Sequence, residues 1–166
     1  MFLYLVRHGD ARREEEDPLR ALSEKGIHDI KRISAHISQL KLDVLRIYHS
    51  PKLRARQTAG ILFDYLKPLK GVSEADGLAP LDDPYIWAAR IEDSHDDTML
   101  VGHLPHLARL SSLLLCGKAE KNIIAFSTAG IVCLDRDYSG IWRLAWILNP
   151  EIIPGEKEAG YACDSL

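Results

Sequence analysis

The chain has 166 residues, of which 46% are hydrophobic and 27% are charged, and its formal net charge is −3. This length and composition fit one globular domain that can bury a core of its own. The small negative charge gives no reason to expect nucleic acid or an anionic membrane as a partner, so any anion site needs a local cluster of cations.

The first predicted element is a short buried strand over residues 2–7, which is broken by Gly9. Its apolar part, Phe2 to Val6, is too short for the apolar region of a signal peptide. No other apolar run is long enough to span a bilayer. We therefore expect a cytoplasmic location and no membrane partner.

Further predicted helices and strands then alternate along the chain. A polar loop covers 10–22, Ser23 is the expected N-cap of the next helix, and residues 71–83 are expected to be mostly loop. The predicted helices cover residues 24–40, from Pro51 to Pro68, 84–92 and from Pro105 to about Leu115, where Gly117 ends the last one. The predicted strands cover 44–48, 98–101, 123–134 and 141–148.

This alternation predicts the fold class. We expect an α/β fold, a three-layer sandwich with a mainly parallel central sheet flanked by helices on both faces. No linker interrupts the pattern, so we expect one domain over residues 1–150 and an irregular C-terminal tail over 151–166. The three cysteines, Cys116, Cys133 and Cys163, form neither a disulfide framework nor a zinc pattern, and Cys163 is expected to be a free thiol in the tail.

Three predicted strands end on residues that suit an anion. The strand ends read Arg7-His8-Gly9, His49-Ser50-Pro51 with Arg54 shortly after, and Gly102-His103. In a parallel sheet these ends lie on one edge, where open α/β sheets bind their ligands. Helix N-termini add free backbone N–H groups there, and arginine binds phosphate oxygens in a bidentate way. The sequence therefore predicts a phosphate site at this edge.

These motifs carry a family resemblance. The segments LVRHGDA, SPKLRARQTA and VGHLP, in this order and each after a strand, resemble the histidine phosphatase superfamily, also called the phosphoglycerate-mutase-like fold. Ala11, Arg20 before Leu22-Ser23, and Phe126 with Thr128-Ala129 narrow the likeness to small phosphohistidine phosphatases of the SixA type. The likeness covers most of residues 1–150.

The resemblance implies a role for each matching residue. His8 would be the nucleophile that takes the phosphoryl group, and Arg7, Arg54 and His103 would hold its oxygens. Arg20 and Gly9 would contribute to substrate binding. Neighbouring guanidinium groups disfavour the imidazolium form of a histidine and neutralise phosphoryl charge, so we expect neither a metal ion nor a cofactor.

The sequence departs from the family pattern at the general acid. A carboxylate before Leu-x-Pro is typical of the SixA type, whereas this chain has Gly77 there. The sequence does not choose among the possible substitutes, which are Asp10, Asp76, Asp82 and Asp83. An alkoxide leaving group needs such an acid, whereas the imidazole that leaves phosphohistidine does not need it to the same degree.

We therefore predict a phosphatase that acts on phosphohistidine of a protein through a phospho-His8 intermediate. A chain of 166 residues has no room for a large capping insertion, and an open site suits a protein side chain. The alternatives are a phosphatase for small phosphomonoesters, a mutase and, from another class, a phosphate-binding module without turnover.

Other polar residues near the motifs are expected to have structural roles. Ser50 is expected to cap the following helix, and His49 to be a structural residue at the strand end. Arg56 is expected to point away from Arg54, since it lies about 200° further around a helix of about 3.6 residues per turn. His103 and His106 share a spacing seen in metal sites, but no nearby carboxylate or cysteine completes a ligand set.

Overall fold

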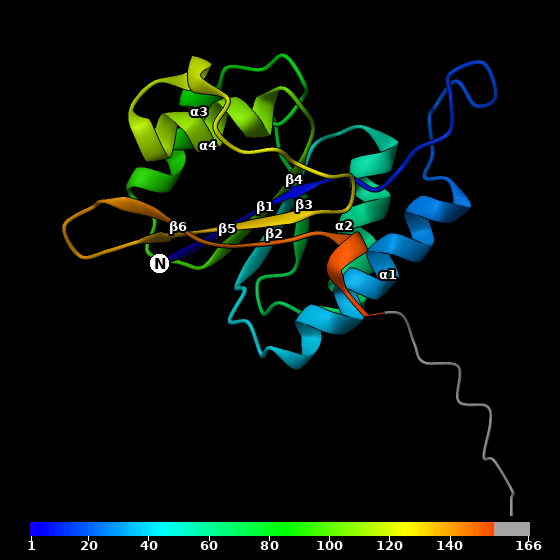
Figure 1. Ribbon diagram of the computed structural model, residues 1–166, viewed down its shortest axis with the longest axis horizontal. Helices are drawn as coiled ribbons and strands as arrows, with labels where there is room; N and C mark the ends of the chain where they lie inside the picture. Colours follow the sequence, from blue (N-terminus) through cyan, green and yellow to red (C-terminus); the bar gives the residue numbers. More distant parts are fainter. Residues whose placement is uncertain (155–166) are drawn as a thin grey trace, which may run out of the picture.

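The computed structural model describes residues 1–154, which are built around a six-stranded sheet (Figure 1). Its strands are β1 (Phe2–Arg7), β2 (Arg46–His49), β3 (Val72–Glu74), β4 (Thr98–Gly102), β5 (Ile131–Arg136) and β6 (Trp142–Leu148). Their order across the sheet is β3-β2-β4-β1-β5-β6. The pairs β3–β2, β2–β4 and β4–β1 are parallel, and β5 and β6 extend the sheet as antiparallel strands. The predicted α/β fold with a mainly parallel sheet is confirmed.

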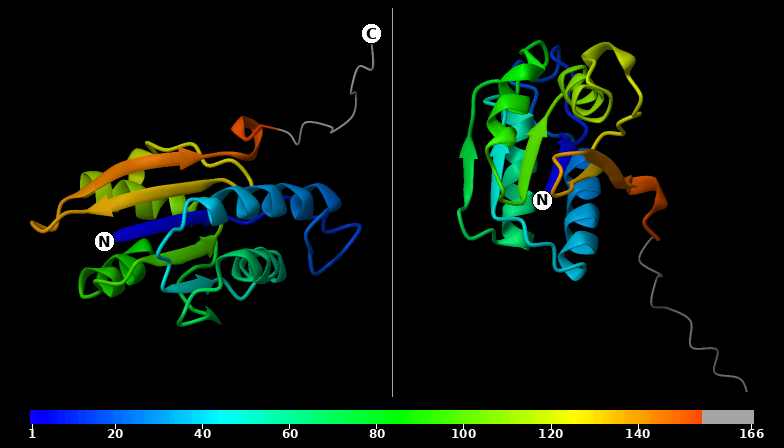
Figure 2. Two further views of the ribbon diagram at one scale, coloured as in Figure 1. Left: turned by 90° about the horizontal axis from the view of Figure 1, so that it is seen from below. Right: turned by 90° about the vertical axis from the view of Figure 1, so that its left-hand side faces the viewer.

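Helices cover both faces of this sheet (Figures 1 and 2). Helices α1 (Glu24–Gln39) and α2 (Leu53–Leu66) lie on one face, and α3 (Pro84–Glu92) and α4 (His106–Cys116) lie on the other. Side chains alternate along β1, as they must in a strand: Tyr4 and Val6 pack in the core under α1 and α2. Leu3 and Leu5 pack in the core under α3 and α4. The predicted three layers are therefore present.

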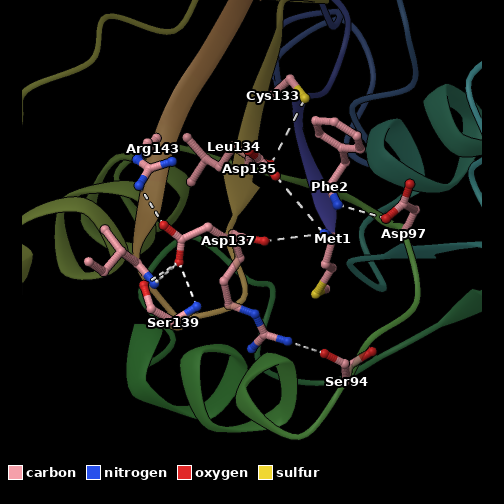
Figure 3. Close-up of polar contacts among 12 residues, drawn as sticks. Met1, Phe2, Ser94, Asp97, Cys133, Leu134, Asp135, Asp137, Ser139 and Arg143 are labelled. Atoms are coloured by element: carbon pink, nitrogen blue, oxygen red, sulfur yellow. Dashed lines mark hydrogen bonds and ion pairs between the residues drawn. The ribbon is translucent and has the colours of Figure 1, made fainter.

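Strand β1 is fixed at its start by contacts of the chain terminus (Figure 3). The Met1 ammonium group donates to the Arg136 carbonyl at 3.3 Å and lies 4.0 Å from an Asp135 carboxylate oxygen. The Phe2 N–H donates to Asp97 Oδ1 at 2.6 Å. Because β1 also pairs with β4 and β5 along its length, the position of its carboxyl end is determined.

Most element boundaries agree with the prediction, and two segments differ. Residues 72–74 were expected in a loop but form β3, which is too short for sequence periodicity to reveal. The predicted strand over 123–134 begins only at Ile131. Ile124 and Phe126 are buried in the core under α3 and α4 without belonging to the sheet. The apolar character of this segment therefore reflects packing and not strand pairing.

Short 3₁₀ turns follow α4, at Ala119–Lys121, and β6, at Pro150–Ile152. The second turn returns to α1, where the Arg32 guanidinium donates to the Ile153 carbonyl at 2.8 Å. The domain boundary at residue 150 stays a prediction, and the rest of the expected tail, with Cys163, lies outside the described residues. Within residues 1–154, no helix combines the length and apolarity needed to cross a membrane.

The start of α1 packs directly on the loop that follows β1. A Cβ atom added at Gly26, in the first turn of α1, would overlap the backbone of Asp10, whereas one added at Gly60 in α2 would meet nothing within 4 Å. Both glycines lie in helices, where alanine is favoured by up to about 1 kcal/mol. Substitution by alanine therefore brings the same gain in helix propensity at both positions, but it causes a steric overlap only at Gly26.

We predict that Gly26→Ala lowers the free energy of unfolding by about 1–3 kcal/mol, because overpacking outweighs helix propensity. Gly60→Ala, the matched control, is expected to raise it by up to about 1 kcal/mol. Urea denaturation of both variants provides the measurement. Equal effects of the two substitutions would contradict the close packing of α1 against Asp10.

Candidate active site

The three predicted strand ends meet at one edge of the sheet. The rings of His8, after β1, and His103, after β4, have centroids 4.8 Å apart. Arg54 in α2 places its Nε atom 3.2 Å from His8 Nε2. Ser50, after β2, places its hydroxyl 2.9 Å from His103 Nε2. The parallel strands thus bring together His8, His103 and Arg54, which the sequence had assigned to one site.

The hydrogen bonds of His8 define its tautomer. Nδ1 lies 2.6 Å from the Gly9 carbonyl oxygen, and because a carbonyl oxygen only accepts, Nδ1 carries the proton. In a neutral imidazole Nε2 is then an acceptor, as the hydrogen bond donated by Arg54 Nε also requires. The ring therefore presents the lone pair of Nε2 toward Arg54.

His8 is held in the neutral form. Burial is the largest cause that lowers its pKa, and the positive charges of Arg54, Arg7 and Arg20 lower it further. The hydrogen bond to Gly9 opposes them, and the resulting pKa is about 4, against an ordinary value of 6.5. At neutral pH the Nε2 lone pair is thus free of a proton, which a nitrogen nucleophile requires.

His103 is also buried and neutral. Burial lowers its pKa to about 3, with smaller contributions from His8, Arg54 and Lys52. Within residues 1–154 its Nδ1 atom is buried without a hydrogen-bond partner. Its other nitrogen is held by Ser50, which fixes the ring beside His8.

The expected capping role of Ser50 is wrong. Helix α2 begins at Leu53 with Lys52 at the N-cap, and no side chain caps it. The Ser50 side chain is fully buried, and its hydroxyl lies 2.9 Å from His103 Nε2. The same hydroxyl accepts a long hydrogen bond, at 3.4 Å, from the Lys52 N–H before α2. His49 is buried with Nδ1 2.9 Å from the Ser50 carbonyl oxygen, which agrees with a structural residue at the strand end.

Arg7 is anchored from behind by the segment that precedes β5. Its guanidinium donates to the Phe126 carbonyl at 2.8 Å. In the same segment the Ala129 N–H donates to the His8 carbonyl at 3.2 Å, and Ala129 has a positive φ of 61°. The irregular stretch before Ile131, where a strand is predicted, therefore supports the turn that carries His8.

Two motif residues that the sequence reasoning did not single out hold the site together. Thr58 accepts a hydrogen bond from the Gly9 N–H at 3.1 Å and donates to the Arg54 carbonyl at 2.8 Å. Gln57 accepts from the Leu22 N–H at 2.8 Å, which fixes the end of the first loop. Their presence in the segment SPKLRARQTA was the available signal.

Arg20 reaches the site from the loop between β1 and α1, which lies at the same end of the sheet as the start of α2 (Figure 1). Its charge lowers the pKa of both His8 and Arg54. Arg20, Arg54 and Arg56 line one groove of about 500 Å³. Of these three arginines, Arg54 contacts the His8 ring. The direction in which the Arg56 side chain points stays a prediction.

The backbone conformation disfavours a side chain at the position where an acid was expected. Gly77 has a φ of +76°, and a Cβ there would lie 2.9 Å from Ile86 Cγ2 and 3.3 Å from Trp87. The segment nevertheless passes close to the site, because the Leu78 carbonyl oxygen is 3.4 Å from the Cβ position of Gly102. A carboxylate at residue 77 would be strained by its backbone conformation and its contacts.

Each of the four candidate carboxylates has a local structural contact. Asp10 accepts from the Ser23 hydroxyl at 2.6 Å, and Asp76 pairs with Arg90 at 2.7 Å. Asp82 accepts from the Ala79 N–H at 2.8 Å, and Asp83 caps α3 by accepting from the Tyr85 N–H at 3.1 Å. Contacts of this kind stabilise loops and helix starts.

His106, at the start of α4, is fully buried. Neither of its ring nitrogens has a hydrogen-bond partner within residues 1–154, and burial lowers its pKa to about 4. In that part of the chain, no group of three or more His, Cys, Asp or Glu side chains is arranged to hold a metal ion.

Comparisons with known proteins agree with this geometry. Residues 3–81 match the model of the histidine phosphatase superfamily (branch 1). The chain is 25% identical over 155 residues to the phosphohistidine phosphatase SixA of Escherichia coli (strain K12), covering 90% of this chain and 94% of the relative. It is 37% identical over 142 residues to an uncharacterized protein of Picosynechococcus sp., covering 81% and 84%.

The fold also matches a solved structure of the protein histidine phosphatase SixA complexed with tungstate. The TM-score is 0.80 at 25% identity, over 90% of this chain and 97% of the other. The chain therefore belongs to the histidine phosphatase superfamily, and the resemblance found in its motifs is confirmed. By class it is a phosphatase that acts on a phosphorylated substrate.

The buried histidines predict that acid destabilises the fold. His8, His103 and His106 have folded-state pKa values of about 4, 3 and 4, all below the ordinary 6.5. Below pH 6.5 the unfolded chain binds protons that the folded chain excludes. The stability that these groups contribute is thus complete above pH 6.5 and is lost as the pH falls toward 4.

We expect the free energy of unfolding, measured by urea denaturation at pH 7.5, 6.5, 5.5 and 5.0, to fall below pH 6.5. Each excluded proton contributes up to about 1.4 kcal/mol per pH unit. His106→Leu removes one of the three titrating groups, so the free energy of unfolding of this variant should fall less steeply with acid. The substitution also removes two buried polar atoms that lack hydrogen-bond partners. A variant with the slope of the parent would show that His106 is not held neutral.

Proposed function

We propose that this phosphatase hydrolyses phosphohistidine on a protein through a phospho-His8 intermediate. The observation that carries the proposal is the neutral His8 ring, whose Nδ1–H is bound to Gly9 and whose Nε2 lone pair faces Arg54. The likeness to the phosphohistidine phosphatase SixA supports this substrate class. Tungstate, bound in the solved SixA structure, is a tetrahedral oxyanion like phosphate.

In the first step His8 Nε2 attacks phosphorus, and the P–N bond to the substrate imidazole breaks. A substrate ring that carries a proton on its other nitrogen leaves as a neutral imidazole. His8 becomes phosphorylated on Nε2 and keeps its Nδ1 proton, which stays on the Gly9 carbonyl. One phosphoimidazolium is consumed and one is formed, so the step balances without a separate general acid.

In the second step a water oxygen attacks the phosphorus of phospho-His8. The P–Nε2 bond breaks, and its electron pair returns to Nε2. Both protons of the water leave with the phosphate, and His8 regains its neutral Nδ1–H form. The same tautomer thus begins and ends the cycle, and the Gly9 carbonyl holds it throughout.

The remaining site residues stabilise the phosphoryl group. Arg54 lies beside Nε2, where its hydrogen bond to the ring can pass to a phosphoryl oxygen. Arg7 and Arg20 place further positive charge near His8, as their effects on its pKa indicate. Such cations neutralise the charge on the equatorial oxygens in the transition state. His103, held by Ser50, lies beside the His8 ring.

The choice of substrate rests on the leaving group. Residue 77 is a glycine, an acid there would be strained, and the nearby aspartates are engaged in local contacts. An alkoxide would have to leave without protonation, which is costly, whereas imidazole leaves phosphohistidine at little cost. Phosphatase activity on small phosphomonoesters is the alternative, and it requires one of these aspartates to act as the acid.

We predict that His8→Ala lowers phosphate release from a phosphohistidine carrier protein by at least about a thousandfold, because the nucleophile is lost. Rapid quenching of the parent with labelled carrier should trap phosphate on His8 in an acid-labile, base-stable form. His95→Ala is the matched control. His95 is exposed and precedes β4, at the edge of the sheet opposite the carboxyl ends of the strands, so this variant should retain both release and label. A parent that binds phosphate but never labels His8 would be a module without turnover.

We also predict a steep dependence of kcat/KM on the leaving group of phosphomonoesters. Without a general acid, para-nitrophenyl phosphate should turn over at least about a hundredfold faster than phosphoserine. Four single variants test the aspartates: Asp10→Asn, Asp76→Asn, Asp82→Asn and Asp83→Asn. Each should change that ratio by less than about threefold, whereas loss of a true general acid would change it far more. Efficient hydrolysis of phosphoserine that one of these variants abolishes would favour the phosphomonoesterase alternative.

A further inference from the structure

A basic groove lies beside His8, between the loop after β1 and the start of α2. We call the basic groove the cavity of about 500 Å³ that is lined by Glu14, Pro18, Leu19, Arg20, Pro51, Lys52, Leu53, Arg54 and Arg56. Four of these residues are cations, and one is an acid. The groove therefore carries a local positive charge in a chain whose net charge is −3.

The four cations differ in what they can do for the reaction. Arg54 contacts His8 Nε2, and Arg20 is close enough to lower the His8 pKa. The Arg56 side chain has neither a hydrogen bond nor an ion pair to any residue in 1–154, and the same is true of the Lys52 ammonium group. The ion pairs of that part of the chain all lie elsewhere, between Met1 and Asp135, Lys25 and Asp29, Lys70 and Asp96, Arg90 and Asp76, and Arg143 and Asp137.

Arg56 and Lys52 thus extend the positive charge beyond the reacting phosphoryl group. Both are exposed. Lys52 is the N-cap residue of α2, and Arg56 lies in the first turn of that helix, after Arg54. A single phosphoryl group that is bound by Arg54, Arg7 and Arg20 does not need them. Their charge is available to an anion that lies next to the reacting group.

The apolar part of the lining indicates the kind of ligand. Leu19 has 71% of its surface exposed, and Pro18, Pro51 and Leu53 line the groove with it. A small, highly hydrated anion gains nothing from apolar contacts, whereas a polypeptide segment buries apolar and charged groups together. Mixed cationic and apolar lining therefore suits a peptide segment that carries acidic side chains.

We propose that the basic groove binds acidic residues that flank the phosphohistidine of the protein substrate. This inference rests on the proposed function, since the flanking residues reach the groove only when the phosphoryl group is at His8. Arg56 and Lys52 would then select the substrate, whereas Arg54 and Arg20 also serve the reaction. Complementary charge of this kind steers association and fixes the orientation of the partner.

Two synthetic peptides of equal length test the proposal. Each carries one phosphohistidine, flanked by glutamates in the acidic peptide and by lysines in the basic peptide. The readout is the ratio of their kcat/KM values, acidic over basic, because the ratio cancels any general loss of activity. We expect a ratio of about ten or more for the parent, which decreases in 0.5 M salt as charges are screened.

The double variant Lys52→Glu with Arg56→Glu should bring this ratio to about one or below. The matched control, Lys41→Glu with Lys67→Glu, makes the same charge change at exposed residues just after the C-terminal ends of α1 and α2, and it should keep the parental ratio. A groove variant with the parental ratio, or a control that loses it, overturns the inference.

Other outcomes separate this inference from the proposed function. Release from neither peptide by the parent overturns the proposed function itself. Equal release from both peptides by the parent leaves the proposed function standing and overturns the groove inference. Inorganic pyrophosphate, tested as an inhibitor of para-nitrophenyl phosphate turnover, is the second probe. If the groove variant weakens that inhibition and leaves the peptide ratio unchanged, the groove holds a second phosphate of a small ligand and the inference is overturned.

Discussion

The site depends on a turn, Arg7-His8-Gly9, whose backbone is held from several sides. The His8 N–H donates to the Gly102 carbonyl at 3.1 Å, and the His8 carbonyl accepts from Ala129 at 3.2 Å. The Gly9 N–H is bound by Thr58 in α2. The Gly9 carbonyl is thus fixed where it can accept the Nδ1–H of His8. A single backbone oxygen determines which ring nitrogen is free to react.

Burial and positive charge act in the same direction on the two histidines of the site. Both lower the pKa of His8 and of His103, so both rings stay uncharged even in mildly acidic solution. The arginines that lower the His8 pKa are also the groups placed to neutralise phosphoryl oxygens. One set of charges therefore keeps the proposed nucleophile neutral and suits the phosphoryl anion that it would receive. Because the folded chain excludes protons from these buried imidazoles, its free energy of unfolding decreases once the pH falls into the range where free histidine titrates.

The segment around Gly77 bears on substrate choice through its backbone. Its positive φ and the nearness of Ile86 and Trp87 disfavour any residue that has a side chain. The position at which the resemblance leads us to expect an acid therefore packs against α3. The proposed preference for an imidazole leaving group follows from that packing, and it is consistent with an open, basic surface beside the site.

The layers of the fold and the central residues of the site could be predicted from the sequence alone. Apolar strands, helical periodicity and the glycine after α4 predicted the sandwich, because local pattern and burial agree there. His8, Arg54 and His103 were predicted to meet because parallel strands end on one edge. The short strand β3 and the irregular, buried stretch before Ile131 were not predicted, because neither has a period that distinguishes it.

The way in which the site residues are held and charged became apparent only in the folded chain. The hydroxyl of Ser50 holds His103 beside the start of α2, and Thr58 joins Gly9 to α2. Arg56 lines the basic groove because a helix start that lies against a loop exposes several of its faces to one cavity. These features depend on contacts between segments far apart in the chain. Sequence spacing carries no information about the distances or the burial that such contacts create.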